Sequence, residues 1–425
     1  MATTEQPTSR RPPAPTQLIA KERYTSQEFL NSELDTMWSR VWQIACLESD
    51  IPNPGDYCEY TIGLESVLVV RGFDGVVRAF LNVCQHRGRQ LRQGAGNTHQ
   101  LRCPFHGWTW NLDGTLAEAP EREEFCPFAN EEVALVDVRV DQWEQFIFIN
   151  LNPDAEPLLE YLGAIPERLK GHKLSGQYKW FSRSTTLPVN WKTALDAFQE
   201  AYHGRFVHAE SIHFVDYVDN PIELLDRHSV LSATFGVPDR LINVETDVDT
   251  MLDAMEWTFA AFGEDTQLIG ALRSMNLPEG TLLREVLIPL IAGGMAELGI
   301  DVSELSETEL VDDWEYFIFP NVELHVLSFG AWMFRTRPID DDPESMIFDM
   351  WYFHKVPDGM ETPPPAEHIH VPNGETCGAV MDQDFRQVEV QQRGFHSAGF
   401  KGLRLSTMET RISHMHDVLD RYINS

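Results

Sequence analysis

The chain has 425 residues, and 43% of them are hydrophobic, which is ordinary for a folded protein with a sizeable core. Its 66 acidic and 33 basic residues give a formal net charge of -33, which repels nucleic-acid phosphates and anionic membrane surfaces. We therefore expect neither nucleic acid nor a membrane as a partner. The start of the chain shows no apolar signal-peptide core, and we expect a cytoplasmic enzyme.

The N-terminal half predicts a disordered segment, a short helical segment and a β domain. Residues 1–17 are rich in Pro, Thr and Arg and are expected to be disordered. A helical pattern at about Ser26–Trp42 places a helix in segment 18–45, which we expect to pack on the catalytic domain. From Gly55 to Asn152, short β-rich runs alternate with turns such as FDGV and LDGT, which predicts a small antiparallel β domain over residues 46–160.

The remaining residues, 161–425, predict a mixed α+β domain. We expect a helix from Trp191 to about Phe206, a mostly helical stretch up to about Ser306, and then the strands DWEYFIFP, VELHVLSFGAWMFRTRP and SMIFDMWYFHKV. Two helices close the chain, and the last begins with Ser406 and Glu409 at capping-box spacing. The apolar segment from Met251 to Leu298 suggests a roomy pocket or lid.

Two Cys/His pairs lie inside the predicted β domain. Cys84 and His86 stand in NVCQHRGRQL, and Cys103 and His106 stand in CPFHGWTW. A four-coordinate zinc ion would accept two thiolates and two imidazoles. However, a CxH loop followed by a CPxHGW loop within a β domain resembles the Rieske fold, in which two Cys hold one iron of a [2Fe-2S] cluster and two His hold the other.

A second group of possible metal ligands lies in NWKTALDAFQEAYHGRFVH. Asp196, Glu200 and His203 are spaced to share one face of a helix. His208 lies about 140° further around a regular helix, so both imidazoles reach one ion only if the helix ends or distorts, which Gly204 permits. Two His and one carboxylate form the facial triad of oxygen-activating Fe(II). The third ligand must be a distant Asp or Glu.

From about Trp38 to the C-terminal helix, these motifs resemble the catalytic (alpha) subunit of the Rieske non-haem iron aromatic-ring-hydroxylating oxygenases. The late element DFRQVEVQQRG belongs to the same pattern. The resemblance implies a helix-grip (START/Bet v1-like) catalytic domain and assigns Cys84, His86, Cys103 and His106 to the [2Fe-2S] cluster. It assigns His203, His208 and Asp384 to a mononuclear Fe(II), with Asp382 as the competing third ligand. Without the resemblance, MDQDF is read as an acidic turn that caps a helix.

The resemblance also implies roles for four other residues. Glu200 would link His203 to His106 of a neighbouring chain in a homotrimer, and Asp196 would line the pocket or bond to an iron-ligand imidazole. Asn321 and His325 are candidates for contact with substrate.

The implied activity is that of a terminal oxygenase, which uses O2 and electrons from a separate reductase, and from a ferredoxin in some systems, to hydroxylate an apolar aromatic or polycyclic substrate. Ring dihydroxylation, monooxygenation, and oxidative demethylation or hydroxylation of a non-aromatic substrate stay open, as does a small beta subunit. The rival classes are an electron-transfer protein and a zinc-stabilised ligand-binding protein.

Overall fold

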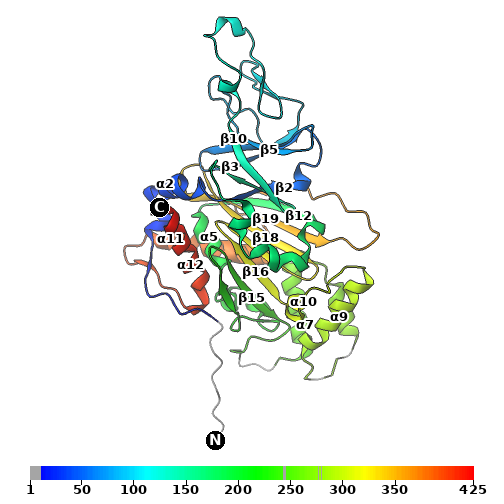
Figure 1. Ribbon diagram of the computed structural model, residues 1–425. Coiled ribbons are helices and arrows are strands. Elements are labelled where there is room, and N and C mark those ends of the chain that lie inside the picture. The colour runs from blue at the N-terminus through cyan, green and yellow to red at the C-terminus, as the bar shows by residue number, and fades with distance from the viewer. Residues whose placement is uncertain (1–10, 243–245, 276, 279) are drawn as a thin grey trace. The chain divides into compact units, whose positions relative to one another are not determined.

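The computed structural model describes residues 11–242, 246–275, 277–278 and 280–425 (Figure 1). Most of the N-terminal segment predicted to be disordered, residues 1–10, lies outside this range. The chain divides into two compact units. One contains residues up to 29, 167–338 and 343–424, and the other contains residues 30–166, 339–342 and 425. Among the described residues, no helix is long and apolar enough to cross a membrane.

The smaller unit, residues 30–166, is built on antiparallel sheets, as predicted. Its main sheet has the order β2-β11-β10-β5-β4-β3-β6, and a separate sheet has the order β7-β8-β9. The strands are β2 (Gln43–Leu47), β3 (Asp56–Ile62), β4 (Glu65–Arg71), β5 (Val77–Leu81), β6 (Ala95–Asn97), β7 (Leu101–Arg102), β8 (Thr109–Trp110), β9 (Leu116–Glu118), β10 (Asp137–Trp143) and β11 (Phe146–Asn150). A hydrophobic cluster that contains Leu101, Trp108 and Trp110 joins the small sheet to the main one.

The larger unit is built around a nine-stranded sheet of order β13-β15-β16-β17-β18-β19-β12-β20, in which β14 pairs with β15. The pairs from β13 to β18 are antiparallel, as is the pair of β12 and β19, whereas β12 and β20 run parallel. The strands are β12 (Gln177–Leu187), β13 (Val215–Asp216), β14 (Ile222–Leu224), β15 (Ser229–Phe235), β16 (Asp313–Ile318), β17 (Val322–Val326), β18 (Gly330–Ile339), β19 (Asp342–Lys355) and β20 (Ile369–Val371). The predicted strands of residues 313–355 are present. However, β13–β15 fall where we predicted mostly helix.

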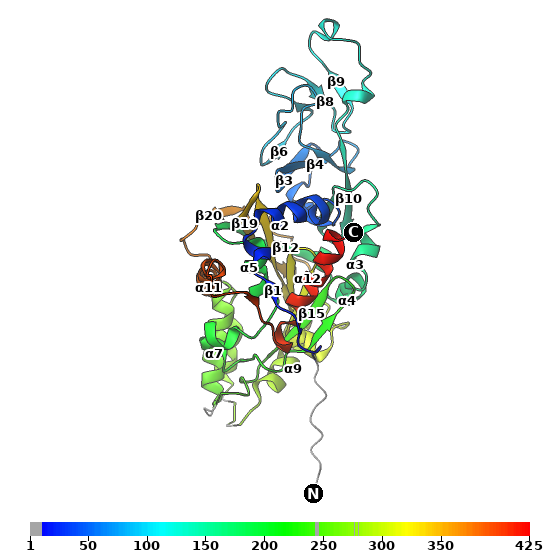
Figure 2. The same cartoon turned by 90° about the vertical axis from the view of Figure 1, so that its left-hand side faces the viewer.

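Helices cover this sheet and carry the candidate site. They are α5 (Trp191–Ala197), α6 (Gly204–Val207), α7 (Val248–Ala261), α8 (Gln267–Ser274), α9 (Leu283–Glu297), α10 (Glu307–Val311), α11 (Ala379–Phe395) and α12 (Thr410–Ile423). Helices α5 and α11 pack against each other, and both views place them side by side (Figure 1, Figure 2). The predicted capping box is present before α12, because the Glu409 side chain accepts from the Ser406 backbone N–H.

The single helix predicted from Trp191 to Phe206 is wrong, because the chain leaves the helical path after Ala197 and resumes it at Gly204. The Glu200 carboxylate accepts a hydrogen bond from the His203 backbone N–H at 3.0 Å, which satisfies a donor at the start of α6. The α6 turn is regular, since the His208 N–H donates to the Gly204 carbonyl, and it ends at His208. Gly204 is needed for packing, because a Cβ there would lie 2.2 Å from Cε1 of Tyr217.

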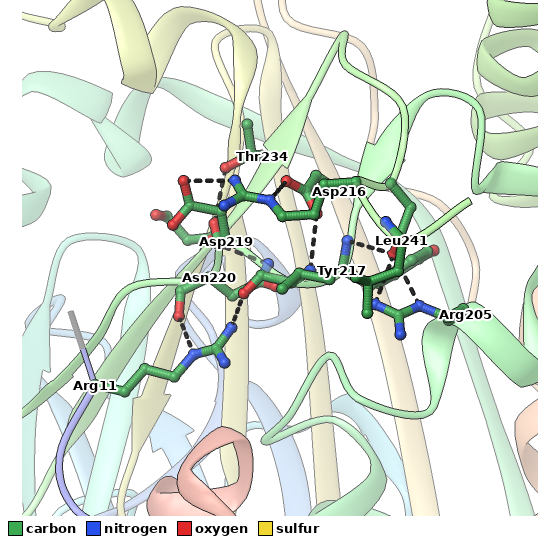
Figure 3. Close-up of polar contacts among 12 residues, drawn as sticks. Arg11, Arg205, Asp216, Tyr217, Asp219, Asn220, Thr234 and Leu241 are labelled. Carbon is green, nitrogen blue, oxygen red and sulfur yellow. Dashed lines mark hydrogen bonds and ion pairs between the residues drawn. The ribbon is translucent and has the colours of Figure 1, made fainter. Parts of the chain in front are cut away.

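The segment that follows α6 is held by a polar network around two buried carboxylates, Asp216, which Figure 3 shows, and Asp239. Asp239 accepts from both Nε and Nη2 of Arg205 at 3.0 Å and from the Tyr217 backbone N–H at 3.3 Å. Arg240 donates to Asp216 at 2.8 Å. These bonds position Tyr217 beside α6.

Candidate functional site

Two loops of the smaller unit repeat one backbone arrangement. In residues 84–89 the Cys84 N–H donates to the carbonyl of residue 89 and the Gly88 N–H donates to the Cys84 carbonyl. In residues 103–108 the Cys103 N–H donates to the carbonyl of residue 108 and the Gly107 N–H donates to the Cys103 carbonyl. Gly88 and Gly107 both have positive φ, 75° and 80°, a conformation that favours glycine. The two loops are therefore local equivalents, each with Cys first and Gly fifth.

The four predicted cluster ligands lie on these loops. Cys84 and Cys103 are buried and interact with each other, and the rings of His86 and His106 are 4.8 Å apart between centroids. Burial, followed by the neighbouring Cys103, raises the pKa of the Cys84 thiol, so a bound metal is needed to hold it as a thiolate. Two thiols and two imidazoles are the donor set of a Rieske [2Fe-2S] cluster, and the residues fit this group. His106 is exposed, whereas His86 stacks on Trp108.

In the larger unit, His203, His208 and Asp384 come together although α11 is far from α6 in sequence. Each offers one ligand atom, and these atoms all lie within 4.8 Å of one another. The Asp384 Oδ1 atom is 3.1 Å from Nε2 of His208 and 3.5 Å from Nε2 of His203. Two imidazoles and one carboxylate around one point fit a mononuclear Fe(II). The end of α6 at His208 is what brings the two rings to a centroid distance of 5.2 Å.

The other nitrogen of each imidazole is held by a side-chain oxygen. His203 Nδ1 is 2.8 Å from Glu200 Oε1, and His208 Nδ1 is 2.8 Å from Gln383 Oε1. Because both oxygens accept, both Nδ1 atoms carry the proton, and Nε2 is left for the metal. Sequence reasoning did not identify Gln383, and its only signal was its position next to Asp384 on α11.

Charge balance supports the same arrangement. Burial alone would raise the pKa of Asp384, but hydrogen bonds from His203 and His208 hold it below its usual value, so the carboxylate stays ionised. Burial alone would lower the pKa of His203, but Glu200 and Asp384 raise it well above its usual value. The site therefore attracts positive charge.

The competing candidate Asp382 makes contacts of another kind. Its carboxylate accepts from the Cys377 N–H at 2.8 Å and from the Thr376 hydroxyl at 2.7 Å, just before α11 begins. Thus the capping interpretation of MDQDF describes Asp382, while Asp384 is the carboxylate that meets the two imidazoles.

Asp196 lines a cavity together with Glu200, His203 and Asp384, whereas Asn321 does not line it. Asp196 accepts from the Tyr24 hydroxyl at 2.7 Å, and among the described contacts no hydrogen bond joins it to the imidazole of His203 or His208. Burial raises the pKa of Asp196 to about 7. Asn321 is fully buried, and its side-chain N–H donates to the Thr336 carbonyl at 2.7 Å, so this N–H is used within the protein.

A cavity of about 710 Å³, counted with its opening, lies beside His203, His208 and Asp384. His325, the other predicted pocket residue, lines it. The walls also contain seven aromatic side chains, Phe198, Tyr217, Phe235, Trp257, Phe262, Trp332 and Phe334. A second, largely apolar cavity of about 1140 Å³ lies among α7, α8 and α9, within the segment predicted to form a pocket or lid.

Replacing Gln383 by leucine should lower the affinity of the mononuclear site for iron by roughly 10–100-fold, the usual cost of losing such an outer partner. The physical reason is that His208 would lose the acceptor that fixes its tautomer. The loss of affinity is checked by dialysis against increasing concentrations of a chelator, after which the retained iron is measured by atomic absorption. Gln383→Glu keeps an acceptor and should keep the affinity; equal loss in both variants would contradict the assignment.

Comparison with known proteins finds a family match for each of the two units. Residues 41–139 match the family model "Rieske [2Fe-2S] domain", and residues 173–425, more than half of the chain, match "Ring hydroxylating alpha subunit (catalytic domain)".

Curated relatives include the carnitine monooxygenase oxygenase subunit of Escherichia coli K12, 36% identical over 183 residues, which are 42% of this chain and 49% of that protein. The chlorobenzene dioxygenase subunit alpha of Cupriavidus sp. PS12 is 34% identical over 192 residues, 42% of each chain. The matched stretch thus spans about half the length of these relatives, or less.

Solved structures share the fold over nearly the whole chain. A quaternary ammonium Rieske monooxygenase aligns with a TM-score of 0.67 at 20% identity and covers 95% of both chains. A naphthalene 1,2-dioxygenase variant aligns with a TM-score of 0.68 at 19% identity and covers 96% of this chain and 93% of that one. Together with the two metal-binding donor sets, the family match leads to one conclusion: the chain belongs to the ring-hydroxylating alpha subunits that carry a Rieske [2Fe-2S] domain and bind mononuclear iron.

Proposed function

We propose that the chain is the terminal oxygenase component of a multicomponent system and hydroxylates an apolar aromatic or polycyclic substrate with O2. The observation that carries this proposal is the convergence of His203, His208 and Asp384 on a cavity with aromatic walls. Two imidazoles and one carboxylate leave other positions of an Fe(II) ion open. When bound, the cluster supplies single electrons and the ferrous ion supplies the site of O2 reduction.

The protein residues around this site fix the metal ligands, orient the substrate and shield it from water. Glu200 and Gln383 fix the tautomers of the two imidazoles, and ionised Asp384 contributes the negative charge that a ferrous ion needs. The aromatic walls desolvate an apolar substrate and hold it beside the triad. Holding the substrate next to the reacting centre removes by itself a large part of the activation free energy of the reaction.

Electrons would enter at the Cys84, His86, Cys103 and His106 loops from a separate reductase, directly or through a ferredoxin. Exposed His106 is suited to pass them on. We place Glu200 between His203 and His106 of a neighbouring copy in a homotrimer, because its carboxylate already accepts from His203 Nδ1. Besides the two hydrogen bonds that they accept from His203, its oxygens have lone pairs for a further bond from outside the chain.

The test begins with the purified protein. We expect a red-brown preparation with about three irons per chain, two in the cluster and one mononuclear, and a low average-g EPR signal after reduction. The protein is then reconstituted with NADH, a reductase and a ferredoxin under ¹⁸O2, with aromatic acids, polycyclic arenes and steroids as substrates. Products that contain ¹⁸O would support the proposal.

Two results would overturn it. A colourless, zinc-loaded preparation would favour a zinc-stabilised ligand-binding protein. A protein that has the cluster and the third iron but incorporates no ¹⁸O into any substrate of the panel would favour electron transfer alone.

A further inference from the structure

One wall of the cavity beside the triad carries three polar side chains that the proposed oxygenation does not use: Asp313 and Glu315 on β16, and His325 on β17. Glu315 and His325 are Cα partners across the antiparallel pair, and Asp313 lies two residues from Glu315. Side chains alternate between the faces of a sheet, so all three share the face that lines the cavity. They are 6%, 7% and 8% exposed.

Each of these groups has one protein partner of opposite charge. The His325 Nδ1 atom is 2.8 Å from Asp313 Oδ2. Fully buried Arg411, on α12, donates to Glu315 Oε2 at 3.1 Å and also to Glu323. The cluster thus contains three carboxylates and two groups that can be cations, His325 and Arg411. This balance disfavours a further negative charge in the wall.

His325 is held as an imidazolium. Burial alone would lower its pKa, but Asp313, and then Glu315 and Glu323, raise the pKa of His325 to about 9. Both ring nitrogens therefore carry a proton at neutral pH, and with Nδ1–H directed to Asp313, Nε2–H is a donor. Within the described part of the chain, His325 Nε2 and Asp313 Oδ1 have no hydrogen-bond partner, although both residues are more than nine-tenths buried. Unsatisfied buried polar atoms are costly, which points to a ligand.

We propose that His325 and Asp313 form the polar anchor of the substrate site and bind the hydroxyl group of a phenol. A hydroxyl both accepts and donates, so it can accept from His325 Nε2–H and donate to Asp313 Oδ1. A ketone would leave Oδ1 unpaired, and a carboxylate would place a negatively charged oxygen against the Asp313 carboxylate with no proton between them. An ammonium group would face the imidazolium.

The surroundings of the anchor suit the ring of such a substrate. Trp332 on β18 is the Cα partner of His325, and the Phe334 ring stands edge-on to the imidazole at 5.2 Å. Both aromatic side chains line the same cavity as His203, His208 and Asp384. A ring tethered at its hydroxyl would therefore present a fixed set of carbons to the triad. This inference rests on the proposed function, which it narrows to hydroxylated arenes.

Binding to the resting holoprotein tests the anchor without requiring turnover, so a failed oxygenation assay and a failed anchor are distinguishable. Calorimetry at pH 7 compares 2-naphthol, naphthalene and the 2-naphthyltrimethylammonium cation. We expect 2-naphthol to bind about tenfold more tightly than naphthalene, as for one or two net hydrogen bonds in a buried site. In His325→Phe this preference should fall below about threefold, while naphthalene affinity is retained.

His325→Gln, which keeps a donor, should retain part of the preference and serves if His325→Phe does not fold. Equal binding of 2-naphthol and naphthalene to the wild-type protein would overturn the anchor, as would no binding of either. A preference that persists in His325→Phe would also overturn it, and tightest binding of the cation would replace it by a cation site.

Asp313, Glu315 and His325 have a spacing that could hold a metal. A fourth metal per chain that is lost in Asp313→Asn would overturn the proposal in favour of that site.

Discussion

Replacing Asp384 by alanine should abolish turnover and empty the mononuclear iron site while the red-brown colour of the cluster persists. Asp384 is 3% exposed and is the carboxylate that meets both imidazoles, at 3.1 and 3.5 Å. Its loss leaves two neutral ligands, so the effect should exceed the roughly 10–100-fold cost of losing an outer partner. Iron content should fall from about three per chain to about two, measured beside ¹⁸O incorporation.

The matched control is Asp382→Ala, two residues away on the same helix. Asp382 bonds to the Cys377 N–H and the Thr376 hydroxyl, so its loss should cost about 1 kcal/mol of stability, as for a helix cap, and leave iron binding unchanged. If Asp382→Ala lost the iron and Asp384→Ala kept it, the assignment of the third ligand would be reversed.

Replacing Arg411 by methionine should lower the free energy of unfolding by about 3–5 kcal/mol. Arg411 is fully buried and is the cation that bonds to both Glu315 and Glu323, which are also buried. Without it, these carboxylates lose their partner in a region of low dielectric constant, where burial already raises the pKa of Glu315 to about 8. Urea unfolding, followed by circular dichroism, measures the loss.

Arg421→Met on the same helix is the control for this variant. Its ion pair with Asp226 is exposed, at 53% and 72% of the two side chains, and its loss should cost less than about 0.5 kcal/mol. The triple variant Arg411→Met, Glu315→Gln, Glu323→Gln removes the unpaired charges and should recover most of the stability. If Arg411→Met unfolded like Arg421→Met, charge pairing would not be what holds α12 to the sheet.

The two metal-binding donor sets could be predicted because each is encoded in short spacings. Cys84, His86, Cys103 and His106 lie on loops whose turns depend on nearby glycines, so local sequence is sufficient. By contrast, only the spacing of the family motif favoured Asp384 over Asp382, because the chemistry of two carboxylates two residues apart does not distinguish them. What separates them is which side chain of α11 faces α6, a contact between distant parts of the chain.

Other features could not be predicted because they depend on contacts far apart in sequence. Strand β15 has the sequence SVLSATF and is buried almost throughout, so it shows no alternation that distinguishes a strand from a helix. The hydrogen-bond partner of Asp196 could not be predicted from local spacing either. Its actual partner, Tyr24, lies 172 residues away. The unpaired atoms of Asp313 and His325 likewise emerge only when the sheet register aligns β16 with β17.

The close approach of Gly204 to Tyr217 bears on how substrate preference could change in this protein. Gly204 lies in the turn between the two imidazole ligands, and Tyr217, whose ring would be 2.2 Å from a Cβ at position 204, lines the cavity. Any side chain at position 204 would push the cavity wall and the ligand-bearing turn apart at once. Libraries that reshape the cavity should therefore keep glycine at position 204 and vary Trp257, Phe262 or Trp332, whose positions lie outside the turn.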